Sequence, residues 1–293
     1  LNDEDRLTAR ILDWWLEGQL LSETYYYYQE PLGESLGVQA QLPVLLAEYP
    51  FRSEEDVRTY LALLTTLPDY FEEIAAFEQE KSKQGLFMPD EILDKILAQC
   101  RSLFPIDDGH FLVTTFQERL EECGALEPNL RISLEAENLR NLRRYVEPAY
   151  ETLGQALEHL RGTGREPGGL YHTPDGIGYY EYLLTYSVGT DLGMAEIHRL
   201  LEDQMESDYE TMLYALHQNT DLLHITDDAP ALETPEEILT SLQTQIGEDF
   251  PQPGDISWQV KEVPDSLADF LSPAFYMTPA IDAPQQNTIY INP

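Results

Sequence analysis

The segment Gly33–Gly37 matches the GxSxG pattern that carries the nucleophile of many serine hydrolases, with Ser35 at the reactive position. In those enzymes the serine stands on a sharp turn between a strand and a helix, above a parallel sheet. Here a tyrosine-rich helical pattern precedes the serine, and too little chain lies upstream to build the central strands. A glycine-rich turn after Pro31 is the better interpretation, so Ser35 is predicted to be unreactive.

Histidines and carboxylates are the next candidates, because together they hold metal ions. The six histidines are His110, His159, His172, His198, His217 and His224. None is followed by Glu, so the chain contains no HExxH motif, and none has Glu three residues before it, so the di-iron pattern is also absent. His198 and Glu202 lie one helical turn apart, but an acidic helix gives such pairs by chance. We therefore assign no catalytic residue, no metal ligand and no cofactor to this chain.

Tyrosine is abundant, with 18 residues that include the runs Tyr25–Tyr28 and Tyr179–Tyr182. A tyrosine offers both a stacking face and a hydroxyl group, which suits the binding of sugars or peptides. Packing at helical spacing is the commoner use of such residues. A non-catalytic peptide- or glycan-binding helical module nevertheless stays open as an alternative function.

Charge excludes some partners. The chain has 54 Asp and Glu against 17 Lys and Arg, which gives a net charge of -37. Such a polyanion repels nucleic acids and anionic membranes, so we expect neither as a partner. No apolar run approaches the roughly 20 residues that span a bilayer. Cys100 and Cys123 lie on apolar helical faces, where buried free thiols are expected.

Helical periodicity dominates the elements that must position these residues. Ser53 is predicted to cap one helix, Gly85 to end another, and Pro148 to kink or break a third. Thr234 and Glu237 form a predicted capping box at the start of a later helix.

Near the C-terminus, Ile256, Trp258 and Val260 alternate with polar residues, and 288–292 is a second β-prone segment. The expected fold class is therefore mainly α, a multi-helical body with a small β element near the C-terminus. We expect an N-terminal helical region over 1–165, a second helical region over 166–250, and a β and loop segment over 251–293.

Several stretches, in order along the chain, carry a family resemblance. They are Gly37–Pro43, Gly85–Pro89, Leu170–Gly176, Tyr179–Leu184, Gly189–Leu192, Glu196–His198, Phe275–Asp282 and Thr288–Asn292. In order and spacing they resemble the bacterial family known as domain of unknown function 885, over nearly the whole chain.

Members of that family look like zincin metallopeptidases whose HExxH helix lies in the C-terminal half, where two histidines bind zinc and the glutamate acts as general base. The resemblance implies that this chain is the N-terminal, cleft-forming half of a zinc-dependent peptidase, inactive by itself. Zinc, a peptide substrate and a C-terminal catalytic half would belong to the full-length parent.

The same resemblance places Tyr276, Tyr290 and Asn292 beside the substrate cleft, next to an edge strand that pairs with an extended peptide. We also expect the terminal β segment to lack a neighbouring strand, so that the chain either forms a homodimer through this end or leaves the end poorly ordered. Resembling bacterial proteins are often lipoproteins, which implies an extracytoplasmic, lipoprotein-anchored parent.

Overall fold

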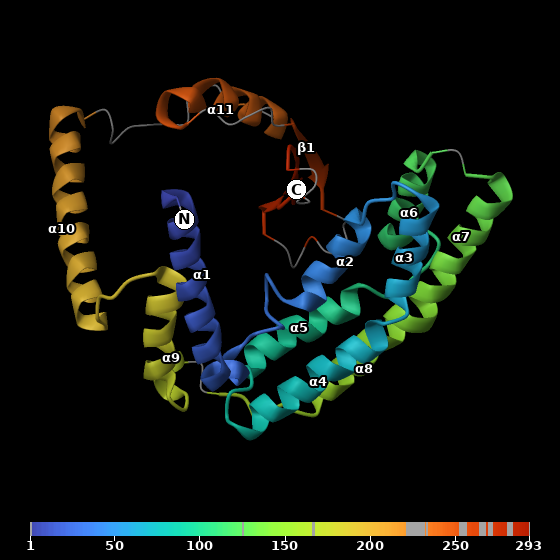
Figure 1. The fold of residues 1–293 in the computed structure, drawn as a ribbon, viewed down its shortest axis with the longest axis horizontal. Coiled ribbons are helices and arrows are strands. Elements are labelled where there is room, and N and C mark those ends of the chain that lie inside the picture. The colour runs from blue at the N-terminus through green and yellow to red at the C-terminus, as the bar shows by residue number, and fades with distance from the viewer. Residues whose placement is uncertain are drawn as a thin grey trace. The chain divides into compact units, whose positions relative to one another are not determined.

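The computed structural model describes residues 2–124, 126–165, 168–220, 232, 234–251, 257–263, 268, 272–279 and 284–292. It confirms the predicted fold class, a mainly helical chain with a small sheet near the C-terminus (Figure 1). The helical elements are α1 (Asp3–Ser22), η1 (Glu23–Tyr28), α2 (Val38–Glu48), α3 (Glu54–Leu64), α4 (Leu67–Lys83), α5 (Asp90–Ser102), α6 (Phe111–Glu122), α7 (Pro128–Asn141), η2 (Leu142–Val146), α8 (Glu147–Glu158), η3 (Leu170–His172), α9 (Gly176–Leu183), η4 (Leu184–Val188), α10 (Met194–Gln218) and α11 (Pro235–Asp249). The strands are β1 (Ser257–Glu262), β2 (Ala274–Met277) and β3 (Gln286–Ile291).

Contacts between Cα atoms divide the chain into two compact units. The larger unit contains residues 16–179, 262–274 and 292–293, and the smaller unit contains residues 1–15, 180–261 and 275–291. The predicted boundaries at residues 165 and 250 concern regions along the sequence, which these units do not test. The three predicted regions therefore stay a prediction.

Local sequence signals set the helix ends. The Ser53 hydroxyl accepts a hydrogen bond from the Asp56 amide at the start of α3. Gly85 adopts a left-handed φ of 72° after α4, a conformation that glycine tolerates best. Around Pro148 the helix passes through a π-helical turn, η2, immediately before α8. The π-helical turn lets the helix continue past Pro148, which has no backbone donor. It is the irregularity that was predicted at this proline.

The core of the larger unit is built around α8, which packs against α4 and α5 (Figure 1). Phe71 of α4 meets the Tyr150 ring edge-to-face with centroids 4.7 Å apart, and Ser82 bonds Thr163 beyond the end of α8. These contacts show that α4 and α8 run in the same direction. Cys100 and Cys123 are free thiols buried in this unit, as predicted.

The three described strands form one sheet in the order β1-β3-β2. The Ser257 amide donates to the Gln285 carbonyl oxygen, and Gln259 bonds Thr288, so β1 runs parallel to β3. Phe275 of β2 stacks on Tyr290 of β3, and the order of contacts makes this pair antiparallel. The expectation that the terminal segment lacks a neighbouring strand is therefore wrong. The strand β2 was not predicted from the sequence, and it is one of the two neighbours of β3.

In the smaller unit, the Thr234 hydroxyl and the Glu237 carboxylate cap the start of α11 reciprocally, as predicted. The long helix α10 has no buried residue. Among the helices that the structure describes, none has the length and apolarity needed to cross a bilayer.

Candidate functional site

Two of the three predicted substrate-binding residues lie on opposite faces of the sheet. Tyr290 is buried, and its ring stacks on Phe275 at 5.0 Å with an interplanar angle of 7°. Tyr276, the next residue along β2, is 55% exposed, and its hydroxyl donates to Asn287 Oδ1 at 2.6 Å. Because successive side chains of a strand point to opposite faces, only Tyr276 offers its ring to solvent. Their role in substrate binding stays a prediction.

Asn292, the third predicted residue, is engaged by its own surroundings in the larger unit. Its side-chain nitrogen donates to the Ala268 carbonyl oxygen at 2.6 Å, and its backbone amide donates to the Pro273 carbonyl oxygen at 2.8 Å. These bonds fix the chain where β3 ends. The structure thus gives Asn292 an anchoring role.

A pocket of about 410 Å³ lies between α5 and α8 in the larger unit. Leu97 and Tyr150 line its apolar part, and Gly154 leaves space because it has no side chain; the nearest atom to a Cβ added there would be Leu97 Cδ2, at 3.7 Å. Arg101 and Glu158 are among its charged residues. The lining combines an apolar floor with charges of both signs, which suits a small amphiphilic molecule.

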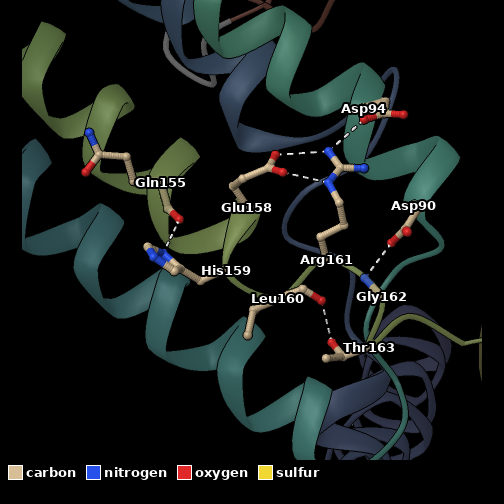
Figure 2. A network of polar contacts seen from close by, with 9 residues as sticks. All are labelled: Asp90, Asp94, Gln155, Glu158, His159, Leu160, Arg161, Gly162 and Thr163. Carbon is tan, nitrogen blue, oxygen red and sulfur yellow. Dashed lines mark hydrogen bonds and ion pairs between the residues drawn. The ribbon is translucent and has the colours of Figure 1, made fainter.

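A polar network fastens α8 to α5 beside this pocket. Figure 2 shows Arg161 reaching both Glu158, at 2.6 Å, and Asp94, at 2.8 Å. The hydrogen bonds from Arg161 lower the pKa of Glu158. The backbone amide of Gly162 donates to Asp90 Oδ1 at 3.0 Å (Figure 2). The network joins the C-terminal end of α8 to the N-terminal part of α5. The two helices α5 and α8 run antiparallel, and these bonds fix one end of that pair.

The larger unit also contains a buried charge cluster formed by Glu30, Glu78, Lys81 and Arg165. Lys81 and Glu78 have fully buried side chains, one helical turn apart on α4. Lys81 Nζ donates to the Gln29 carbonyl oxygen and to Glu30 Oε2, both at 2.9 Å. Arg165 Nη2 lies 2.9 Å from Glu30 Oε1. The cluster therefore ties the segment after η1 to α4 and to the segment after α8.

Glu78 is the least satisfied member of this cluster. Lys81 Nζ is 3.6 Å from Glu78 Oε1, beyond ordinary hydrogen-bond length. Among the described residues, no donor forms a hydrogen bond with either carboxylate oxygen. Burial raises the pKa of Glu78 to about 7, because desolvation outweighs the attraction of Lys81. The side chain can therefore exchange a proton near neutral pH.

The first tyrosine run is used within the fold. The Tyr28 ring lies 4.2 Å from that of Tyr179, and its hydroxyl donates to the Pro174 carbonyl oxygen. The Tyr25 hydroxyl bonds Asp175 Oδ2 at 3.4 Å, where Asp175 has a left-handed φ of 52°. These tyrosines hold the turn that precedes α9, so their contacts are structural.

Among the described residues, the remaining sequence candidates do not assemble a reactive centre, and His224 lies outside the described residues. Ser35 is exposed in a turn before α2, and the segment preceding that turn is helical, so it has no strand-to-helix elbow. His198 Nδ1 lies 3.4 Å from Glu202 Oε2 on exposed α10, which gives two possible ligands. Within the described ranges, no three His, Cys, Asp or Glu side chains converge to hold a metal ion.

Comparison with known proteins identifies the family of this chain and one solved structure with a similar fold. The family described as "Bacterial protein of unknown function (DUF885)" matches residues 1–293, and the chain belongs to it. A crystal structure described as that of "the putative lipoprotein from Colwellia psychrerythraea" matches with a TM-score of 0.75 and 19% sequence identity. The match covers 89% of this chain and 48% of that chain, so this chain spans about half the length of that protein. No curated protein matches.

Sequence reasoning missed the buried charge cluster and the pocket. The cluster did leave a signal, because Glu78 and Lys81 continue the apolar face of α4 that Phe71 and Ile74 begin. Charged residues at apolar positions of a helix indicate a buried ion pair. The pocket left only Gly154 within a helical pattern, which alone does not identify a cavity.

Proposed function

We propose that this chain is the non-catalytic, cleft-forming part of a zinc-dependent bacterial peptidase, and that residues outside it hold the zinc ion. Membership of the family supports this function through the resemblance of its members to zincins. The solved structure belongs to a chain about twice as long, which is consistent with a further part that we propose to be catalytic. An extracytoplasmic, lipoprotein-anchored location is part of the same proposal.

The observation that carries the proposal is the exposed outer strand of the sheet. In the described sheet β2 has β3 on one side only, and it presents Tyr276 to solvent. An extended peptide binds such an edge through backbone hydrogen bonds, while exposed side chains select its residues. The Asn287 side chain holds the Tyr276 hydroxyl in place, so the ring is already positioned for a ligand. Tyr276 is therefore the residue we assign to peptide binding.

The test compares this chain with a longer family polypeptide that contains an HExxH helix. We expect one equivalent of zinc and peptide hydrolysis in the longer polypeptide, and neither in this chain. Tyr276→Phe in the longer polypeptide should raise KM only slightly, since the ring is kept and only the hydrogen bond that positions it is lost. Tyr276→Ala should raise KM with little change in kcat, because binding is lost and the chemistry is not.

Two results contradict the proposal. Hydrolysis by residues 1–293 alone would place the catalytic groups in this chain. A longer polypeptide that binds no zinc and cleaves no peptide would exclude the peptidase function. The tyrosine-based binding module gains no support from Tyr25 and Tyr28, whose hydroxyls are used within the fold.

A further inference from the structure

The pocket between α5 and α8 has a floor that offers a ligand no charge and no free hydroxyl group. Leu97, Cys100 and Tyr150 form this floor, and all three are buried. The Tyr150 hydroxyl is already used, because it donates to the Gln39 carbonyl oxygen at 3.0 Å. Burial raises the pKa of Cys100 to about 12, so its thiol stays protonated near neutral pH. The part of a ligand that reaches the floor must therefore be apolar.

The size of the pocket limits the ligand to one small molecule. Its volume of about 410 Å³ lies near the lower end of the range of roughly 300–1,000 Å³ that small-molecule sites occupy. Phe104 is half-buried in the lining, and its ring meets that of Tyr150 edge-to-face with centroids 5.6 Å apart. Such rings pack well against an aromatic or branched aliphatic group.

The rim of the pocket carries opposite charges on its two helices. Arg101 of α5 and Glu151 of α8 both line the pocket and are exposed. The helices run antiparallel, with Leu97 opposite Gly154. At a rise of about 1.5 Å per residue, Arg101 lies about 6 Å beyond Leu97, and Glu151 lies about 4.5 Å beyond Gly154 in the same direction. The backbone positions of the two charged residues are therefore nearly level on facing helices.

These two charges are not paired within the part of the chain that the structure describes. No described residue forms a hydrogen bond or an ion pair with the side chain of Arg101 or Glu151. By contrast, both carboxylate oxygens of Glu158 accept hydrogen bonds from Arg161, at 2.6 and 2.9 Å (Figure 2). These bonds lower the pKa of Glu158, and the charge of Arg101 adds a smaller effect. Glu158 is thus compensated, while Arg101 and Glu151 keep their hydrogen-bonding groups for a ligand.

A ligand with a single charge would match this rim poorly. A simple carboxylate would pair with Arg101 but would be repelled by Glu151, and a simple amine would be attracted and repelled in the opposite sense. A zwitterion satisfies both residues. Arginine holds a carboxylate through two parallel N–H donors, and a glutamate accepts hydrogen bonds from an ammonium group.

We propose that the pocket between α5 and α8 binds a free α-amino acid with an apolar side chain. The ligand's carboxylate pairs with Arg101, its ammonium group pairs with Glu151, and its side chain lies on the apolar floor. Both charged groups of an α-amino acid are attached to one carbon atom, so they match two charges that face each other at one level. The site uses only residues of α5, of α8 and Phe104, and so it does not depend on the proposed peptidase function.

Equilibrium dialysis of residues 1–293 against radiolabelled L-phenylalanine tests this site. We expect saturable binding of one equivalent, which unlabelled L-leucine displaces. N-acetyl-L-phenylalanine has no ammonium group and L-phenylalaninamide has no carboxylate group, so each should compete at least about fivefold less well. Glycine has both charges but no side chain, and it should compete poorly because it cannot cover the apolar floor.

Variants locate the contacts. Arg101→Gln and Glu151→Gln should each weaken binding about fivefold or more, because each removes one of the two paired charges. The matched controls are Arg140→Gln on α7 and Glu121→Gln on α6, which make the same changes of charge at exposed positions outside the pocket and should bind as the parent does. Gly154→Leu puts an apolar side chain into the pocket and should abolish binding.

Each contrary result overturns the proposal. Absence of saturable binding would exclude the site, and equal competition by the acetylated and amidated ligands would show that the rim charges are not used. Equal losses in the control variants would show that net charge decides. Unchanged binding by Gly154→Leu, in a variant that circular dichroism shows to be folded, would place the ligand elsewhere. If that variant does not fold, the rim variants and their controls decide. Zinc binding and peptide hydrolysis by the longer polypeptide bear only on the peptidase proposal, so the two proposals stand or fall separately.

Discussion

Replacing Glu78 by Gln should stabilise the protein at alkaline pH, because it removes a buried charge that the fold does not fully compensate. Gln has nearly the same shape as Glu and stays neutral. Lys81 would keep its contacts with Glu30 and with the Gln29 carbonyl oxygen, so the variant would not leave the buried ammonium group unpaired.

The magnitude follows from the pKa. Burial raises the pKa of Glu78 from 4.5 to about 7, a difference of about 2.5. At about 1.4 kcal/mol per pKa unit, the ionised side chain costs the folded state about 3 kcal/mol. The folded state binds more protons than the unfolded state between these pH values, so the free energy of unfolding falls as pH rises through that window. This destabilisation is absent below pH 4.5 and complete above pH 7.

Urea unfolding followed by circular dichroism at pH 4.5 and pH 8.5 measures the effect. We expect Glu78→Gln and the parent to agree at pH 4.5, and the variant to be more stable by up to about 3 kcal/mol at pH 8.5. Glu80→Gln on the same helix is the control, because Glu80 forms an exposed pair with Lys83, worth less than about 1 kcal/mol. A variant less stable than the parent at pH 8.5 would refute the reasoning and show that the Glu78–Lys81 pair is net stabilising.

Three further outcomes follow from the packing of the larger unit. Gly154→Ala should raise the free energy of unfolding by about 0.5–1 kcal/mol, because the new methyl group fits and favours the helix. Gly164→Ala should lower the free energy of unfolding, because its Cβ would overlap a backbone carbonyl group. Thermal unfolding should therefore show a higher unfolding temperature for the first variant and a lower one for the second. Tyr150→Phe should cost about 1 kcal/mol, because the buried hydroxyl donates to the Gln39 carbonyl oxygen at 3.0 Å, and unchanged urea unfolding would show that this bond adds nothing. Cys100 should react slowly with iodoacetamide at pH 8, because burial raises the pKa of its thiol to about 12; rapid labelling in native buffer would contradict its burial, and labelling in urea is the control.

Local chemistry made the helical part of the fold predictable. Ser53, Gly85 and the Thr234–Glu237 pair act through neighbouring backbone atoms, so their effects can be read from a few residues of sequence. The interruption at Pro148 was predictable for the same reason, although its form as a π-helical turn was not. Features that depend only on residues close together in the sequence can be predicted without knowing the tertiary structure.

The candidate site was less predictable because its contacts join distant segments. The strand of Tyr276 is short and was recognised only as part of a motif, so its pairing with β3 was missed. The same omission grouped Tyr276 with Tyr290, which the pleat of the sheet puts on opposite faces. The Lys81 cluster joins residues about 50 positions apart through Glu30, and no local pattern specifies such a pair.

The burial of Lys81 also makes this residue a chemical reporter of core opening. The chain has four lysines, Lys81, Lys83, Lys95 and Lys261, and Lys81 has a fully buried side chain. An amine-reactive reagent should modify the exposed Lys83 rapidly, whereas it should modify Lys81 only when the core opens locally. The ratio of the two modification rates, measured by mass spectrometry in one sample, therefore gives the free energy of that opening without denaturant.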